Sequence, residues 1–129
     1  MNAIRRDEDL DNLHSIYVDQ WDWERVISKE QRTVDYLKET VQGLVNAIAE
    51  TSSRLHTKYP KVEATIDTNV SFITSQELAD LYPDLTSKER EHAYVKEHPT
   101  TFILQIGDLL THGEPHDNRA PDYDDWALN

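Results

Sequence analysis

Residues 74–93, TSQELADLYPDLTSKEREHA, decide the local fold of this 129-residue chain, because they contain two helix starts with one helix stop between them. Each start is a capping box, in which a threonine and the glutamate three residues later pair with backbone amides that the helix leaves unsatisfied. The two boxes are Thr74 with Glu77 and Thr86 with Glu89. The segment 82–84 (YPD) interrupts the pattern, since proline lacks the amide that a helix interior needs. The stretch therefore predicts one helix ending at Leu81 and a second ending near Glu97.

A strand-like segment lies on each side of this helix pair. Asn69–Ile73 (NVSFI) and Thr101–Ile106 (TFILQI) are rich in β-branched and aromatic residues, which is typical of strands. The second segment is almost continuously apolar, so we expect it to be buried on both faces. From Gly107 onward the chain is dense in Gly, Pro, Asp and His and is expected to form loops. Because strands alternate with helices, the sequence predicts a mixed α and β fold.

The first half of the chain supplies one more long strand and the longest helix. The polar N-terminus is expected to be a loop with a short strand, and Leu13–Trp23 alternates in the manner of a long strand. Ser28 followed by Gln31 is a further capping box. The apolar residues after it recur at helical spacing: Val34, Leu37, Val41, Leu44, Val45 and Ile48. An amphipathic helix is therefore expected from Ser28 to about residue 56, with Tyr59-Pro60 ending it.

The composition excludes several classes of function. The length suits one domain or part of one, and the net charge of −12 repels a nucleic-acid backbone unless basic residues cluster. The 13 Lys and Arg residues are instead spread along the chain, although a local arginine pair still suits an anionic ligand such as ATP. No cysteine is present, so disulfides and Cys-ligated metals are excluded. The sequence has neither a signal-peptide core nor an apolar run of transmembrane length, which favours a cytoplasmic protein without a membrane partner.

Two polar side chains share one face of the long predicted strand. Gln20 and Asp22 are two residues apart, so both project to the same side. An amide that donates to a carboxylate, beside a carboxylate that accepts from an ammonium group, suits a zwitterionic amino acid. The same pattern is typical of the solvated face of a sheet, and the residues taken alone favour that interpretation.

Arginines near both ends of the chain are candidates for binding anions. Arg5 and Arg6 precede an acidic turn, and a guanidinium group binds phosphate oxygens in a bidentate manner. Ion pairs with the neighbouring acids are the alternative. Arg119 opens the string RAPDYDDW (119–126), where Tyr123 and four acidic or basic neighbours suit either a polar pocket or an acidic surface turn.

A histidine pair late in the chain is the pattern in this sequence that most resembles a metal-binding motif. His112 and His116 are four residues apart, a spacing that places two ligands on one face of a helix. Gly113 and Pro115 oppose a helix there, so no metal site is predicted. The P-loop, the Gly-x-Ser-x-Gly elbow and the dinucleotide-binding glycine set are also absent from the sequence.

Three strings, in this order and at these separations, resemble the ammonia-dependent asparagine synthetases, or aspartate–ammonia ligases. They are HSIYVDQWDWE (His14–Glu24), TSQELADLYPDLTSKEREHA (74–93) and HDNRAPDYDDW (His116–Trp126). The resemblance spans all 129 residues. It implies an α+β fold like the catalytic domain of class II aminoacyl-tRNA synthetases, with a mixed, largely antiparallel sheet flanked by helices, in a homodimer. It also implies that ATP adenylates the side-chain carboxylate of aspartate and that ammonia then displaces AMP to give asparagine.

The resemblance assigns roles to individual residues. Arg5 matches the arginine of the family's second motif, which neutralises the α-phosphate of ATP, although RDEDL (Arg6–Leu10) leaves the choice between Arg5 and Arg6 open by one residue. Glu8 belongs to the same nucleotide-binding segment. Gln20 matches a glutamine that holds aspartate, and acts with Arg5 as a catalytic residue. The remaining matches to the substrate pocket and its ammonia-facing side are Asp22, Arg119, Tyr123 and Asp124.

The sequence also departs from the family pattern. It begins inside the second motif and lacks the third, so residues 1–129 are expected to be a partial catalytic domain that is inactive alone, with the Mg²⁺ ligands in the missing part. Where the family has a glycine-rich strand end similar to GIGGKLSDG, this chain has QIGDLLTHG, with Gln105 and Asp108 in place of glycines. Two alternatives remain: a non-catalytic remnant that binds a partner or itself, and a fragment of an aspartyl- or asparaginyl-tRNA synthetase.

Overall fold

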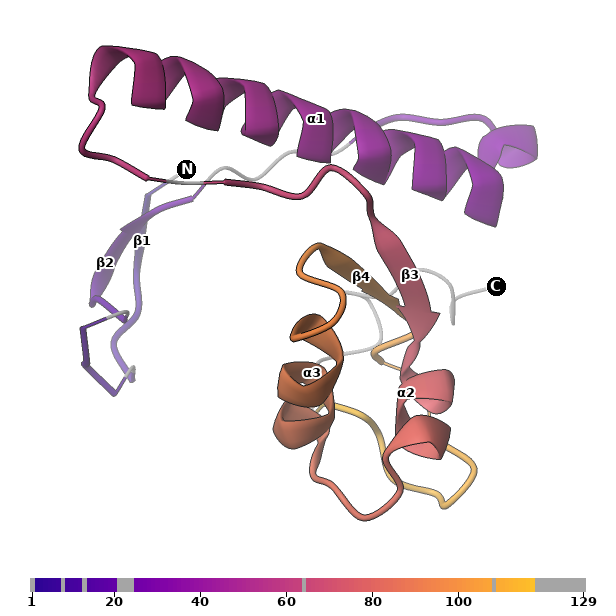
Figure 1. Cartoon of the computed structure of the whole chain (residues 1–129). Helices are drawn as coiled ribbons and strands as arrows, with labels where there is room; N and C mark the ends of the chain where they lie inside the picture. The colour runs from indigo at the N-terminus through magenta and orange to yellow at the C-terminus, as the bar shows by residue number, and fades with distance from the viewer. Residues whose placement is uncertain are drawn as a thin grey trace. The chain divides into compact units, whose positions relative to one another are not determined.

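The computed structural model describes residues 2–7, 9–12, 14–20, 25–63, 65–107 and 109–117. The chain divides into two compact units, Met1–Arg32 and Thr33–Asn129, and each is described by itself. The elements are β1 (Asn2–Ile4), β2 (Tyr17–Asp19), the 3-10 helix η1 (Lys29–Gln31), α1 (Val34–Lys58), β3 (Ser71–Thr74), α2 (Ser75–Leu81), α3 (Ser87–Val95) and β4 (Thr101–Leu104) (Figure 1). Strands and helices occur together, so the predicted α+β class is confirmed.

The N-terminal unit is built on an antiparallel strand pair. Strands β1 and β2 pair over three residues each, with Ala3 opposite Val18. The strand predicted over Leu13–Trp23 is shorter among its described residues, where it covers only Tyr17–Asp19; residues 13 and 21–23 lie outside the described part of the chain. The reason is a local turn, because the Asp11 carboxylate accepts from the His14 backbone amide at 2.7 Å and lies 2.8 Å from its Nδ1.

Helix α1 exists where the periodicity predicts it, but its start lies later than expected. The capping box at Ser28 opens only the short η1, and the box is completed by the Gln31 side chain, which accepts from the Ser28 amide at 2.9 Å. Thr33 then adopts an extended conformation and becomes the N-cap of α1, its hydroxyl accepting from the amide of Tyr36 at 3.2 Å. The helix ends at Lys58, close to the predicted position. None of the described helices is both long and apolar enough to cross a membrane.

One part of α1 contacts the strand β3 and the segment before it. Val41 is buried, and the Gln42 amide donates to the carbonyl of Thr68 at 2.8 Å. The Lys38 ammonium lies 5.5 Å from the centre of the Phe72 ring. Further along the apolar stripe the side chains are more open, with exposed fractions of 38% at Leu44, 56% at Ile48 and 46% at Leu55. The predicted amphipathic helix is therefore only partly covered.

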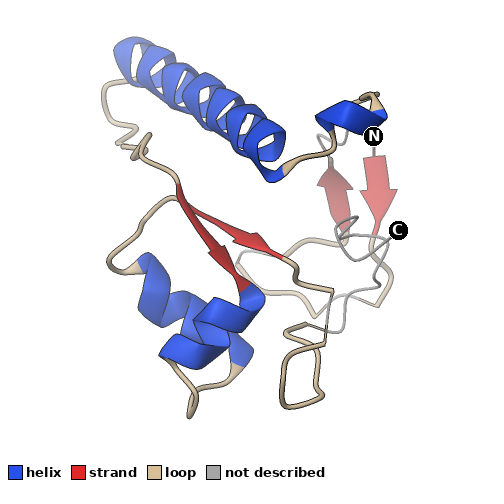
Figure 2. Cartoon of the chain, turned by 90° about the vertical axis from the view of Figure 1, so that its right-hand side faces the viewer, coloured by secondary structure: helices blue, strands red, loops and turns tan. Residues whose placement is uncertain are grey.

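Strands β3 and β4 form a parallel pair, and helices α2 and α3 lie between them in the sequence. Ser71 pairs with Thr101, and the register continues to Thr74 with Leu104. Figure 2 shows the two strands side by side. The second strand was predicted to be buried on both faces; it is instead half-buried throughout and ends at Leu104, because the described residues give it a single neighbouring strand. The most buried apolar side chains of the described residues lie around these elements: Val41, Ile73, Leu78, Ala79 and Leu110.

Both capping boxes in residues 74–93 form as predicted. The Glu77 carboxylate accepts from the Thr74 amide and hydroxyl, both at 2.8 Å. Glu89 accepts from the Thr86 amide at 2.9 Å and from its hydroxyl at 2.7 Å. Helix α2 has the predicted bounds, whereas α3 ends two residues before the expected Glu97. These local signals determine where both helices begin.

The turn between the two helices is held by a buried arginine. Arg90 is 8% exposed, and its guanidinium donates to the carbonyl of Tyr82 at 2.9 Å and to that of Pro83 at 3.2 Å. These carbonyls lie where α2 ends and cannot be satisfied within that helix. Arg90 therefore ties α3 to the end of α2.

The chain leaves β4 through a strained residue. Gln105 has a φ of +60°, in the left-handed region that a residue with a Cβ enters only at a cost. Its carbonyl accepts from the hydroxyl of Ser75 at 2.7 Å, and Ser75 is 2% exposed. The resemblance to the asparagine synthetases leads us to expect a glycine at this position, and the backbone of Gln105 adopts a conformation that glycine favours.

Replacing Gln105 with glycine is expected to stabilise the chain relative to a matched alanine. A left-handed L-residue costs roughly 1–2 kcal/mol, partly offset by the greater freedom of glycine in the unfolded chain, so Gln105→Gly should unfold with a free energy about 1 kcal/mol above that of Gln105→Ala. Urea titration followed by circular dichroism measures the difference. Equal stabilities of the two variants would show that the turn is not strained.

The capping boxes also make stability depend on pH. Hydrogen bonds from the Thr74 amide and hydroxyl lower the pKa of Glu77, and those from the Thr86 hydroxyl and amide lower the pKa of Glu89. A carboxylate whose pKa is lower in the folded state stabilises the fold above its unfolded pKa, and this contribution is lost as the pH falls through the folded pKa. The free energy of unfolding is therefore expected to fall between about pH 5 and pH 3.

The double variant Glu77→Gln/Glu89→Gln isolates this effect. Glutamine keeps the capping box but does not titrate, so the variant should lose less stability on acidification than the parent chain. Urea titrations at several pH values give the comparison. An identical pH profile in both proteins would assign the acid sensitivity to other groups.

Candidate functional site

Three of the eight candidate site residues lie in the described part of the chain. Arg5, Arg6 and Gln20 belong to the N-terminal unit. The other five lie outside the described residues: Glu8, Asp22, Arg119, Tyr123 and Asp124. The described candidate residues therefore all belong to one hairpin, and the loop that leads to residue 118 belongs to the other unit and is described by itself.

The hairpin places Arg5 and Gln20 near its two ends. The ladder continues past β1, because the Arg5 amide donates to the carbonyl of Ile16 at 2.7 Å. Gln20 directly follows β2, four residues beyond Ile16, so the two candidates are separated by roughly 13 Å along the strand. Arg5 is exposed and Gln20 is half-buried. A ligand held by both side chains therefore has to lie along the hairpin between them.

One face of the hairpin is more covered than the other. Ala3 and Val18 are opposite each other and half-buried, and strand alternation places Gln20 on the same face. The opposite face carries a polar network in which Asn2 donates to the Tyr17 hydroxyl at 2.6 Å. The sequence predicted which residues share the face of Gln20, but it gave no sign of the Tyr17 contact, because its partner comes from the other strand.

Arg6 lies in the turn after the ladder ends. Its neighbour Arg5 is held through its backbone by Ile16, whereas Arg6 is exposed within a turn. The structure therefore gives Arg5 the more defined backbone position of the two. Which guanidinium contacts a ligand stays a prediction.

A tight loop, residues 109–117, carries the chain from β4 toward Arg119. Leu109 and Pro115 form an antiparallel bridge, and the Leu110 amide donates to the carbonyl of Glu114 at 2.9 Å. At its tip the amide of Gly113 donates to the Leu110 carbonyl at 2.8 Å, with a φ of +88° that glycine adopts without strain. The expected irregular segment is thus an ordered turn.

The two histidines of this loop do not act together. His112 is exposed, whereas the side chain of His116 is fully buried with its Nε2 3.0 Å from the Glu91 carboxylate. Within the described ranges, no group of three or more His, Cys, Asp or Glu side chains converges to hold a metal ion. Local spacing gave no sign of the pair between Glu91 and His116, because its members are 25 residues apart.

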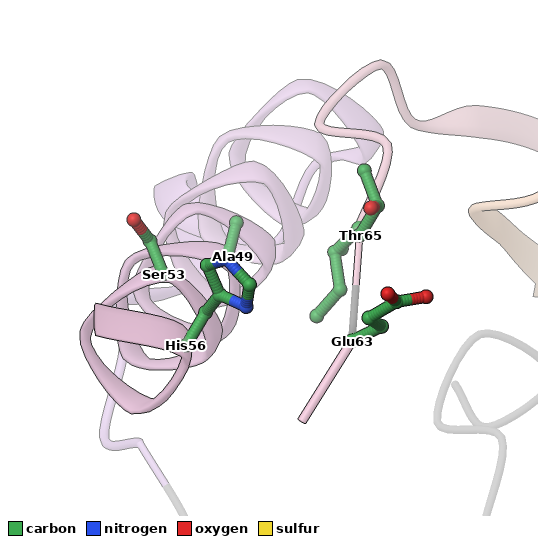
Figure 3. Close-up of a pocket in the computed structure, with 6 residues that line it drawn as sticks. Ala49, Ser53, His56, Glu63 and Thr65 are labelled. Atoms are coloured by element: carbon green, nitrogen blue, oxygen red, sulfur yellow. The ribbon is translucent and has the colours of Figure 1, made fainter. Parts of the chain in front are cut away.

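A pocket of about 490 Å³ lies elsewhere, between α1 and the segment that follows it (Figure 3). Its lining residues are Ala49, Ser53, His56, Glu63, Thr65 and Ile66. The His56 Nδ1 donates to the carbonyl of Val62 at 2.9 Å, and Figure 3 shows the Glu63 carboxylate turned away from the imidazole. None of the three candidate residues that the structure describes (Arg5, Arg6 and Gln20) lines this pocket.

Comparison with known proteins gives these observations a context. A family model described as aspartate-ammonia ligase matches residues 1–129. Proteins named aspartate–ammonia ligase from Clostridium perfringens, Bacillus mycoides and Bacillus cytotoxicus are 59%, 58% and 57% identical over the 129 residues of this chain. The chain spans 38% of the length of the first relative and 39% of the other two. Because the match extends over the whole chain and agrees with the three strings singled out in the sequence, this chain belongs to the aspartate–ammonia ligase family.

Proposed function

We propose that this chain is part of the catalytic domain of an enzyme that makes asparagine from aspartate, ammonia and ATP, releasing AMP and pyrophosphate. The observation that carries the proposal is the 59% identity to a named aspartate–ammonia ligase over every residue of the chain. Since the chain spans 38% of that relative, the activity belongs to a larger protein, and residues 1–129 are a partial domain within it. Asparagine biosynthesis is the corresponding cellular role.

Arg5 is proposed to neutralise the α-phosphate of ATP. The carboxylate of aspartate is an anion that attacks another anion, so the reaction depends on positive charge placed where negative charge develops. The backbone of Arg5 is fixed by its hydrogen bond to Ile16, which favours it over Arg6 for this role. Arg6 and Glu8 then belong to the nucleotide side of the site.

Gln20 is proposed to hold aspartate on the same face of the hairpin. Ala3 is two residues from Arg5 and opposite Val18, so strand alternation favours a common face for Arg5 and Gln20. Their long side chains reach toward a ligand lying over Val18, with its phosphate toward Arg5 and its amino acid toward Gln20. Holding the two reacting groups together lowers the entropic part of the barrier.

The remaining candidates complete the amino-acid pocket. Asp22, two residues after Gln20, is proposed to accept from the α-ammonium group of aspartate. Arg119, Tyr123 and Asp124 are proposed to line the pocket on the side from which ammonia enters. A carboxylate near the entering nucleophile also suits ammonium, which it attracts before a proton is lost.

ATP enters as a substrate, and the family's Mg²⁺ needs ligands from elsewhere in the enzyme. Within the described ranges, no three His, Asp or Glu side chains converge into a group that could hold a metal ion. The roles proposed for this chain are those of its arginine, amide and carboxylate groups. A cytoplasmic location, a homodimer and a class II synthetase-like sheet belong to the same proposal.

A second candidate function is binding of a partner or of another copy of this chain. It is favoured by the open apolar stripe of α1, where Ile48 is 56% exposed, and by the two sheets, each of which has only two strands among the described residues. Light scattering after size-exclusion chromatography separates the possibilities. A stable monomer that binds neither aspartate nor ATP would argue against both functions and would indicate an inert remnant.

The isolated 129-residue chain is expected to be inactive. It spans 38% of a complete relative, and part of an adenylate site does not supply preorganised charge on both sides of the phosphate. The assay combines the purified chain with aspartate, ammonium, ATP and Mg²⁺ and follows AMP and asparagine. Turnover clearly above that of an Arg5→Ala/Arg6→Ala chain would contradict the expectation.

A chimera tests the residue roles. Residues 1–129 replace the matching segment of the Clostridium perfringens relative, and the product should form asparagine and AMP. Arg5→Ala is expected to lower kcat by about 100-fold, because it removes charge needed in the transition state. Gln20→Ala should raise the KM for aspartate more than it lowers kcat.

The control is Arg54→Ala, which removes an exposed arginine that pairs with Glu50 on the same helix. Its kinetic constants should match those of the parent chimera. Full activity of the Arg5→Ala chimera would reject the phosphate-binding role, and an inactive parent chimera that folds would reject the proposed function.

A further inference from the structure

Side chains from both short helices, α2 and α3, form hydrogen bonds with the loop 109–117. On α2, the side-chain oxygen Oε1 of Gln76 accepts from the backbone amide of Thr111 at 2.8 Å. The side-chain nitrogen Nε2 of Gln76 lies 3.2 Å from the Thr111 hydroxyl. The same nitrogen donates to the Asp80 carboxylate at 2.7 Å. Both ends of the Gln76 amide are therefore engaged, which fixes its orientation.

On α3, Glu91 holds the far end of the loop. Its carboxylate lies 3.0 Å from the Nε2 of His116, and because a carboxylate accepts, the proton of this hydrogen bond is on Nε2. The His116 side chain is 0% exposed, whereas that of Glu91 is 37% exposed. Glu91 therefore extends from a half-exposed position on α3 to the fully buried imidazole ring of His116.

The other nitrogen of the ring argues against a role in packing alone. The Nδ1 of His116 is buried and has no hydrogen-bond partner among the described residues. A buried nitrogen without a partner is unfavourable, and an apolar side chain would fill the same space without that penalty. The feature that an apolar side chain would lack is the hydrogen bond to Glu91, which gives the end of the loop a defined position.

We propose that Gln76 and Glu91 form a two-point clamp on the loop, and that His116 is a positioning residue. The clamp sets where the chain enters the segment 118–129, which carries Arg119 and Asp124. The inference rests on the proposed function only for the roles of those two residues. Through the clamp, helices α2 and α3 would orient the amino-acid side of the site without touching the substrate.

Matched substitutions of His116 separate this role from packing. His116→Gln keeps a donor at about the reach of Nε2, whereas His116→Asn reaches only as far as Nδ1, so the glutamine variant should keep the bond to Glu91 and the asparagine variant should lose it. Glu91→Ala removes the acceptor from a half-exposed helix position and should leave the helix folded. Glu39→Ala, at an exposed position of α1, is the control.

The first readout uses the 129-residue chain and needs no activity. Trypsin cleavage after Arg119 is timed by mass spectrometry and normalised to cleavage after Arg25 in the other unit. Glu91→Ala and His116→Asn should accelerate it at least about fivefold, and His116→Gln and Glu39→Ala less than about twofold. Circular dichroism checks that each variant is folded.

The second readout uses the chimera. His116→Asn should raise the KM for aspartate about tenfold with a smaller effect on kcat, and His116→Gln should restore it. Cleavage after Arg119 that does not respond to Glu91→Ala would overturn the clamp. Faster cleavage with an unchanged KM, in a chimera that Arg5→Ala inactivates, would overturn the positioning role and leave the proposed function intact.

Discussion

The parallel pairing of β3 with β4 is the constraint on which the C-terminal unit depends. Two parallel neighbours cannot be joined by a tight turn, so the chain leaving Thr74 has to return along the sheet before it reaches Thr101. Helices α2 and α3 make that return, and they thereby stand beside the end of β4. From there Gln76 and Glu91 contact the loop that follows the strand. The crossover that closes the sheet is also the support of the C-terminal loop.

Features of the fold that depend on a few neighbouring residues were predictable, and features that depend on distant residues were not. Both capping boxes act within one helical turn, so the starts of α2 and α3 were found. The start of α1 was wrong because two caps compete, and the one at Thr33 rather than Ser28 opens the long helix. The strand around Tyr17 was predicted too long because Asp11 folds the chain back locally.

For the site, the sequence was most informative through its resemblance to a family. Alternation alone placed Gln20 on a defined face, which the half-buried Val18 supports, but it gave no reason to prefer a ligand over solvent. The distance between Arg5 and Gln20 required the pairing register, which no spacing within one strand reveals. The contact of His116 with Glu91 joins residues that only the crossover brings together.

The order of elements around the parallel pair has a consequence for how the chain folds during synthesis. Contacts between residues close in sequence form faster than contacts that close a long loop, so α2 and α3 are expected to form before β3 and β4 meet. Strand β4 leaves the ribosome only after both helices have been made. Until then β3 has an unpaired edge where its final neighbour will bind. That interval is when the nascent unit is most open to association with another chain.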